Sequence, residues 1–373
     1  MKRYKTALMV LGIVLLYFLL SSDETITPAE NLNIPSGIGT DLIFEGNEKK
    51  YLVSASVYTF NKEKDISAII IEGLGTNIGE TRETRQIRSN QKSMLGLEKI
   101  ILLNEDLAKN GIGSLVDILF SNQNISDMAY VAIVKGKALD MLKLKVSDFP
   151  TSSDYIEGLI EASKIQNFYS DNYKVLDMYV RIDAEGRSLV LPYLVIEEGK
   201  PIINGMALFS NDKMMKYVNL QETKILNILR EDKVQGILSL NRGFDKFVSL
   251  YGKSERKVSC EKKDGKYSFT IDVKYKGDVV TNTIFNDLLS SPEKVAQVEK
   301  ELSKELTSMC VECTKMMQEA RLDCYELGRV AAAKFGRGTG VDWGQVVSES
   351  DIQINAKVEV DKFGRGFYSE KAK

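Results

Sequence analysis

The chain has 373 residues and contains no histidine, which narrows the chemistry available to it. Histidine is the commonest general base near neutral pH and the commonest metal ligand. A hydrolase is therefore less expected, although enzymes can act without histidine. We predict no catalytic, cofactor-binding or metal-binding residues, and no cofactor.

Cysteine is scarce, with only Cys260, Cys310, Cys313 and Cys324. The Cys310–Cys313 spacing occurs in zinc and redox sites, but a structural zinc site needs four ligands and no histidine is present to complete one. Apolar residues recur at helical spacing from Val295 to Leu327 and place the last three cysteines on one side of a single helix, residues 292–328. Because a free cysteine often behaves as a small buried hydrophobe, we predict core packing, with a disulfide or redox role as the alternative.

A surplus of charge of either sign is also missing. The 50 basic and 52 acidic side chains are interspersed and leave a formal charge of −2. This distribution excludes the clustered positive field of a nucleic-acid-binding protein. The 43% of hydrophobic and 27% of charged residues are typical of a globular chain, and a chain of this length should form two or three domains.

A long uncharged apolar run, Ala7–Leu20, follows the basic residues Lys2, Arg3 and Lys5. This pattern is read by the secretion machinery and predicts export. The run is short for a free-standing membrane span, which takes about 17–25 residues. Residues 19–22 have the shape of a bacterial lipoprotein box, but Ser22 occupies the position of the lipid-bearing cysteine, so thioether lipidation cannot occur there. We expect an uncleaved signal-anchor, with cleavage and release as the alternative.

Residues 36–198 should form a mixed α/β domain. A hairpin is expected around Glu45–Glu48, Ile66–Ile71 should be a buried strand, and Asn104 should cap the helix that follows the inner strand Lys99–Leu103. The pairs Gly37/Gly39 and Gly73/Gly75 each offer only part of a phosphate-binding loop, so we interpret them as turn glycines.

The second half should contain a hairpin and helix, then a further α/β unit. Residues 202–218 predict the hairpin and 221–230 the helix, followed by strands within 257–275 and the long helix. Apolar residues alternate along Asp351–Val360, which predicts a closing strand with one wet face. The fold class is α+β, a three-part mixed α/β architecture with mostly antiparallel or mixed sheets and a long C-terminal helix packed on a sheet. The predicted divisions are an anchor (1–22), a tether (23–35), an N-terminal α/β domain (36–198), a middle hairpin-helix region (199–256) and a C-terminal α/β domain (257–373).

Several motifs occur together in one order along the chain. The main one is Ile203–Tyr217 (INGMALFSNDKMMKY), just after Leu191–Tyr193 (LPY). The others are Gly39–Asp41 (GTD), Lys99–Ile112 (KIILLNEDLAKNGI), Val134–Ala138 (VKGKA), Leu322–Gly328 (LDCYELG) and Gly364–Gly366 (GRG). Together they resemble the C subunit of spore germinant receptors, the Ger(x)C family of endospore-forming bacteria.

The resemblance implies a three-domain lipoprotein on the outer face of the spore's inner membrane. Such proteins assemble with a multi-spanning A subunit and a membrane B subunit to sense nutrients. The family supplies no catalytic residues to transfer. This chain departs from the family at Ser22.

Three functions compete at this point. The leading one is a membrane-tethered, non-enzymatic receptor subunit that acts through docking surfaces, with no nucleic acid as partner. The alternative is an extracytoplasmic protein that binds a small nutrient molecule in an inter-domain cleft. The third is an exported enzyme that uses two carboxylates among Asp41, Glu72 and Glu105, although solvated surface positions are the simpler expectation for these residues.

Overall fold

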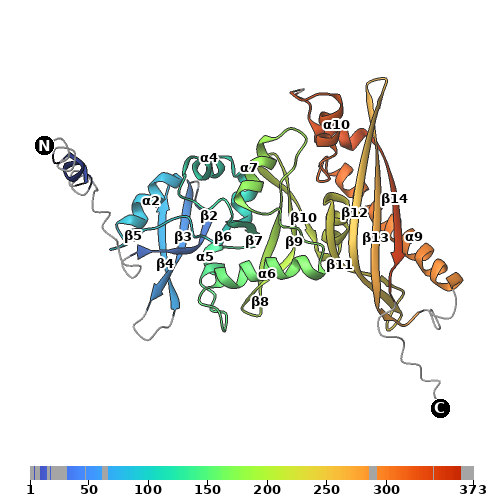
Figure 1. Cartoon of the computed structure of the whole chain (residues 1–373), viewed down its shortest axis with the longest axis horizontal. Coiled ribbons are helices and arrows are strands. Elements are labelled where there is room, and N and C mark those ends of the chain that lie inside the picture. Colours follow the sequence, from blue (N-terminus) through green and yellow to red (C-terminus); the bar gives the residue numbers. More distant parts are fainter. Residues whose placement is uncertain are drawn as a thin grey trace, which may run out of the picture.

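Two sheets lie side by side and form the body of the protein (Figure 1). The computed structural model describes residues 32–46, 48–60, 66–284, 292–338 and 340–362, together with residues 4, 9–14 and 17. The larger sheet has the strand order β10-β9-β8-β7-β6-β2-β3-β4, and the smaller has the order β11-β12-β13-β14. The predicted α+β class with mixed sheets is confirmed.

The eight-stranded sheet has a parallel centre flanked by antiparallel hairpins. β6 (Ile100–Asn104) and β7 (Tyr130–Val134) are buried throughout, and β2, β6, β7 and β8 run parallel. The buried apolar sequence of Lys99–Leu103 therefore forms an inner strand, as predicted. The other strands of this sheet are β2 (Pro35–Glu45), β3 (Glu48–Phe60), β4 (Ile66–Gly75), β8 (Val190–Glu197), β9 (Lys200–Ser210) and β10 (Lys213–Asn219).

Helices cover both faces of this sheet, and alternate residues of β6 enter two separate hydrophobic clusters. Ile101 and Leu103 pack with α3, α4 and α7, whereas Ile100 and Leu102 pack with α5, α6 and α8 in a cluster that continues into the second sheet. The first cluster stabilises only the larger sheet, whereas the second joins both. The helices are α2 (Ile78–Gln86), α3 (Glu105–Asn110), α4 (Gly113–Ser121), α5 (Ala138–Leu142), α6 (Ser152–Gln166), α7 (Val175–Asp183) and α8 (Leu220–Arg230).

Two predictions for the N-terminal strands were wrong. The paired glycines lie inside β2 and β4 rather than in turns, because helices approach these strands closely: a Cβ at Gly37 would overlap the Ser153 hydroxyl, and one at Gly73 would overlap the Thr81 carbonyl oxygen. The strand at Ile66–Ile71 is not buried. β4 is an edge strand of the sheet, and Ile66 and Ile69 are about half exposed.

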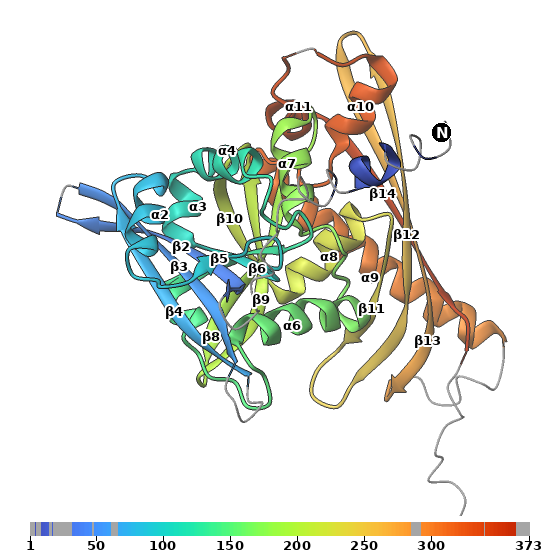
Figure 2. The ribbon, with the colours of Figure 1, turned by 60° about the vertical axis from the view of Figure 1, so that its left-hand side comes forward.

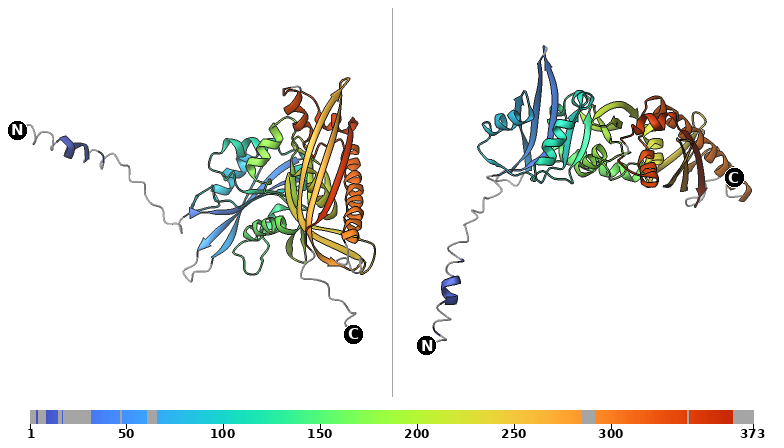
Figure 3. Two further views of the ribbon diagram at one scale, coloured as in Figure 1. Left: turned by 45° about the vertical axis from the view of Figure 1, so that its right-hand side comes forward. Right: turned by 90° about the horizontal axis from the view of Figure 1, so that it is seen from above.

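The smaller sheet carries the long helix on one face (Figures 2 and 3). The closing strand β14 pairs in parallel with β13 and packs against α9, where the Val358 amide donates to Ser303 Oγ at 2.9 Å. Ile354 and Val358 are buried while Gln353 and Lys357 are exposed, which confirms the predicted alternation. The elements are β11 (Lys233–Asn241), β12 (Phe247–Lys263), β13 (Lys266–Asn282), α9 (Pro292–Glu319), α10 (Leu327–Phe335), α11 (Trp343–Glu349) and β14 (Asp351–Val360).

The long helix is shorter than predicted, because α9 ends at Glu319 instead of continuing to residue 328. Arg321 adopts a left-handed backbone with φ of 52°, and the Leu322 amide donates to the Met317 carbonyl at 3.0 Å. This is the bonding pattern of a Schellman helix end, here without glycine. Cys324 and Leu327 therefore lie beyond the helix.

The N-terminal part of the described chain begins at β1 (Leu32–Asn33), which pairs with β5 (Lys92–Ser93). Among the described residues, no helix has the length and apolarity to cross a bilayer. Most of the predicted anchor, including Ser22, the tether as far as residue 31, and the motif Gly364–Gly366 lie outside the described residues.

Two of the predicted domain boundaries fall within continuously paired β structure. The position 198/199 lies in the turn between β8 and β9, which pair with each other, and the position 256/257 lies inside β12. Neither position separates two sheets, since the hairpin of the middle region belongs to the larger sheet. A three-domain division remains a proposal.

Candidate functional site at the junction of the two sheets

The three carboxylates of the enzyme hypothesis have separate structural partners. Asp41 is buried rather than solvated and accepts from the amides of Ala138 at 2.6 Å and Leu139 at 3.0 Å, so it caps α5; burial raises its pKa to about 6. Glu72 forms an ion pair with Lys143 at 2.7 Å, and Glu105 accepts from the Tyr193 hydroxyl at 2.7 Å. None of these three carboxylates contributes to the cleft of about 750 Å³ that opens at the junction of the two sheets.

A short segment formed by the last residue of α6 and the six residues after it, 166–172, contacts both sheets; we call it the junction segment. Phe168 has a left-handed backbone with φ of 61°, and its amide donates to the Gln235 carbonyl at 2.9 Å. Its ring is fully buried over Gly236, where a Cβ would lie only 2.5 Å away, and faces the Tyr275 ring at 6.0 Å. Glycine at position 236 therefore makes room for an aromatic ring supplied by the other half of the protein.

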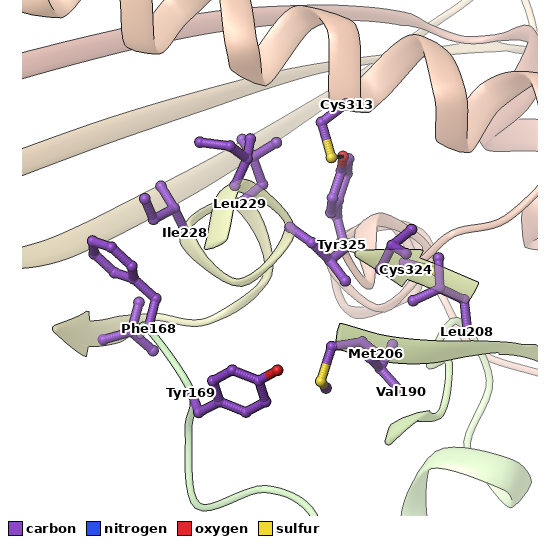
Figure 4. Packing of buried hydrophobic residues seen from close by; sticks show 14 of the residues in the cluster. Phe168, Tyr169, Val190, Met206, Leu208, Ile228, Leu229, Cys313, Cys324 and Tyr325 are labelled. Atoms are coloured by element: carbon purple, nitrogen blue, oxygen red, sulfur yellow. Dashed lines mark hydrogen bonds between the residues drawn. The ribbon is translucent and has the colours of Figure 1, made fainter. Parts of the chain in front are cut away.

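The next residue of the junction segment contacts the larger sheet. The Tyr169 hydroxyl donates to the Gly205 carbonyl of β9 at 3.1 Å, and the ring packs against Tyr173. Figure 4 shows Phe168 and Tyr169 on the same stretch of chain, with Met206 of β9 opposite Tyr169. Of these two consecutive aromatic residues, Phe168 thus contacts the smaller sheet and Tyr169 the larger one.

The start of α10 also lies at the junction. Asp323 is buried and accepts from the amides of Leu327 at 2.8 Å and Gly328 at 2.7 Å. Burial raises the pKa of Asp323 to about 7, because the loss of hydration outweighs these two hydrogen bonds. The Asp323 carboxyl is thus the group that fixes the first turn of α10.

Glu326 is the centre of a buried charge network. Its carboxylate lies 3.2 Å from Arg181 Nε, 3.2 Å from Arg230 Nη2, 3.2 Å from Arg329 Nε and 3.6 Å from Arg187 Nη1. We call these five residues the Glu326 cluster. Burial opposes ionisation of Glu326, but the attraction of the four arginines outweighs it and lowers the pKa of Glu326. The cluster joins α7 and α8, which cover the larger sheet, to α10 beside the smaller one.

A cleft of about 750 Å³ opens beside the Glu326 cluster. Its walls come from α7, β11, β12 and the junction segment, and they carry both signs of charge together with the apolar side chains of Leu176 and Val180. The side chains of Arg187 and Arg329 are 28% and 38% exposed, so they can still contact a solute. Such a lining suits binding of a small polar molecule. In the described part of the chain, no cluster of three or more acidic or cysteine side chains could hold a metal ion.

The cysteines pack in the core, as predicted. All four are buried free thiols, and Cys310 and Cys313 lie on the apolar face of α9. Burial raises the pKa of Cys313 to about 11 even though Cys313 accepts a hydrogen bond from the Tyr325 hydroxyl at 3.3 Å. These thiols are therefore protonated and unreactive near neutral pH.

The residues of the Glu326 cluster were not predicted from the sequence. Glu326 and Asp323 lie in the LDCYELG motif, so the motif was the available signal. Arg181, Arg187 and Arg230 are scattered polar positions with no local pattern, and only the folded chain brings them together.

The raised pKa of Asp323 predicts an unusual pH dependence of stability. The pKa of Asp323 is near 3.8 in the unfolded chain and about 7 in the folded protein. Between these two pH values the folded state holds a proton that the unfolded state has released. Asp323 therefore makes the free energy of unfolding fall as pH rises through this window. Asp323→Asn should flatten that fall, which urea unfolding at a series of pH values would measure. An unchanged slope would contradict the burial of this carboxyl.

The chain is thus an α+β protein of two main sheets that share a hydrophobic core and border a polar cleft. Two family models cover most of the chain: "Spore germination protein N-terminal domain" matches residues 26–196, and "Spore germination B3/GerAC like, C-terminal" matches residues 204–364. The chain belongs to this family, the C-subunit family of spore germinant receptors, and the resemblance noted in the sequence is confirmed.

Individual relatives agree with this assignment. The chain is 21% identical over 299 residues to "Spore germination protein GerQC" of Bacillus cereus, covering 77% of this chain and 81% of the relative. It is 23% identical to "Putative spore germination protein YfkR" of Bacillus subtilis (strain 168), over 56% of each chain. The crystal structure of the GerBC protein superposes with a TM-score of 0.53 at 16% identity, covering 87% of this chain and 97% of that one, which supports the fold.

Proposed function

We propose that the protein is the membrane-tethered, non-enzymatic C subunit of a nutrient germinant receptor. It acts by docking to the A and B membrane subunits, on the outer face of the spore's inner membrane. The observation that carries the proposal is the match of both halves to spore germination proteins, and the basic and apolar pattern of residues 2–20, from which we predict export, supports the tether.

The architecture of the junction supports a coupling role. The hydrophobic cluster on one face of the larger sheet continues without interruption into the smaller sheet. The junction segment and the Glu326 cluster add directional contacts across the same boundary. A displacement imposed on one sheet by a docked subunit would therefore be passed to the other through packed side chains.

A second candidate function is favoured by the cleft. Arg187 and Arg329 have partly exposed side chains and line a space large enough for a small nutrient, together with acidic and apolar residues. Calorimetric titration with amino acids would test it. Binding that Arg187→Gln and Arg329→Gln weaken, and that Lys357→Ala leaves unchanged, would establish a ligand site; the absence of heat would leave docking as the role.

The mode of anchoring gives a direct test of the tether. With Ser22 in place of cysteine, the protein should incorporate no labelled palmitate and should still sediment with membranes, because an apolar helix with a basic flank can hold it without acyl chains. Ser22→Cys should permit lipidation if the rest of the box is adequate. A soluble species that begins near Asp23 would contradict the uncleaved anchor.

A further inference from the structure

Exposed apolar and basic side chains follow one another along residues 87–97, beside the point where the chain enters the larger sheet. Ile87, Met94 and Leu97 are 85%, 45% and 52% exposed, and the cations Arg88 and Lys92 beside them in the sequence are also exposed. We call these five residues the β5 surface. From Thr84 to Leu97 the sequence contains three cations and no carboxylate, so the charge of this segment has one sign.

The entering chain is attached directly to this surface. Leu32 pairs with Lys92, the Met94 amide donates to the Asn33 carbonyl at 2.8 Å, and the Asn33 side chain is buried. The point at which the N-terminal segment joins the folded body is therefore fixed beside Lys92 and Met94. Figure 1 places α2 and β5 at this end of the body and β12–β14 at the other.

The length of chain before β1 limits how far this surface can lie from a membrane. Eleven residues separate Leu20, the end of the apolar run, from Leu32. Fully extended, at about 3.3–3.6 Å per residue, they span at most roughly 40 Å. If Ala7–Leu20 lies in the bilayer, the β5 surface is thus held within reach of the lipid headgroups.

We propose that the β5 surface rests on the anionic membrane surface, with Arg88 and Lys92 at the phosphate groups and Ile87, Met94 and Leu97 in the interfacial layer. Cations attract anionic headgroups, and exposed apolar side chains gain by entering the boundary between headgroups and acyl chains. The proposal rests on the tether of the proposed function and adds an orientation. The end of the larger sheet that carries α2 and β5 lies at the membrane, and the smaller sheet projects away from it.

The test uses the full chain in vesicles of phosphatidylcholine and phosphatidylglycerol that contain nitroxide-labelled lipid. An environment-sensitive fluorophore is attached through Ile87→Cys; the four native cysteines are buried and leave this thiol as the reactive one. Phe244→Cys is the matched control, because Phe244 is also a large exposed apolar residue, 93% exposed, but lies between β11 and β12 in the smaller sheet.

The fluorophore at position 87 should shift to the blue and lose most of its emission to the nitroxide lipid, while that at position 244 should keep its emission. Charge reversal by Arg88→Glu with Lys92→Glu should restore most of the emission at 87, whereas Lys263→Glu with Lys266→Glu on the distant hairpin should not. Equal quenching at both positions in protein that sediments with the vesicles would overturn the orientation and leave the tether standing. Protein that stays in the supernatant would overturn both.

Discussion

Val358→Asp is expected to unfold the smaller sheet and to abolish germination activity. Val358 is 1% exposed, and it lies in the hydrophobic cluster that joins the two sheets. The change forfeits about 1.5–3 kcal/mol of apolar burial. It also places a carboxylate in the core with no partner, at an additional cost of desolvation. Removing the strand by truncation after Ser350 should have the same result. Thermal unfolding followed by circular dichroism would measure the loss.

Lys357→Ala supplies the matched control on the same strand. Its side chain is exposed, and its ion pair with Glu359, at 2.9 Å, lies on the wet face of the sheet. Water screens an exposed ion pair, so this change should barely alter the unfolding temperature. If the truncated chain unfolded at the original temperature and still supported germination, the closing strand would not be part of the structural core.

Glu326→Ala is expected to cost about 3–5 kcal/mol of stability, because removing one partner of a buried ion pair leaves the others uncompensated. Here four arginines would lose their shared carboxylate. The effect should be largest at pH values above the ordinary pKa of glutamate, because a carboxyl whose pKa is lowered on folding stabilises the folded state in that range. This stabilisation disappears as the pH falls through the pKa of Glu326 in the folded protein. Urea unfolding at two pH values would show it.

Glu359 is the control, because its carboxylate also forms several ion pairs but is more exposed than that of Glu326. Glu359 bonds Lys274 and Lys357 at 2.8 and 2.9 Å on the wet face of the smaller sheet. Glu359→Ala should cost little, since water screens these pairs. Equal losses for the two variants would show that the Glu326 cluster does not hold the sheets together.

Elements with a strong local pattern were predictable from the sequence. The alternation along Asp351–Val360 places a strand, and Asn104 does cap α3 by accepting from the Leu107 amide at 3.0 Å. The hairpin of β9 and β10 and the helix after it also lie where the sequence indicated. In each case the signal is contained in a few neighbouring residues.

Elements whose pattern depends on distant residues were missed. α6 buries serines along with Ile156 and Ile160, so its apolar stripe is weak, although the capping box of Thr151 and Asp154 was a usable signal. α7 exposes Leu176 and Val180 at the cleft and buries Val175 and Met178, which gives it apolar residues on two faces. α6 therefore lacks the single clear stripe that marks an amphipathic helix, whereas α7 is amphipathic but short, and part of its wide apolar side is exposed.

The junction could not be predicted for a related reason. Phe168 and Arg321 have the left-handed backbone conformation that glycine usually adopts. Because neither residue is glycine, the sequence gives no signal for a turn at these positions. Three of the four arginines around Glu326 are distant in the sequence: Arg181 lies in α7, Arg187 between α7 and β8, and Arg230 in α8. Only the packing of the two sheets brings them within ion-pair distance.

Co-purification from spore membranes tests the central claim most directly. An affinity-tagged copy of this chain, solubilised from the inner membrane of spores in which it replaces the native copy and supports germination, should recover a multi-spanning A subunit and a membrane B subunit in comparable amounts. The Val358→Asp variant should recover neither. Two results together would contradict its role as a receptor C subunit. The intact chain would be recovered without either subunit, and spores from which the gene is deleted would germinate normally.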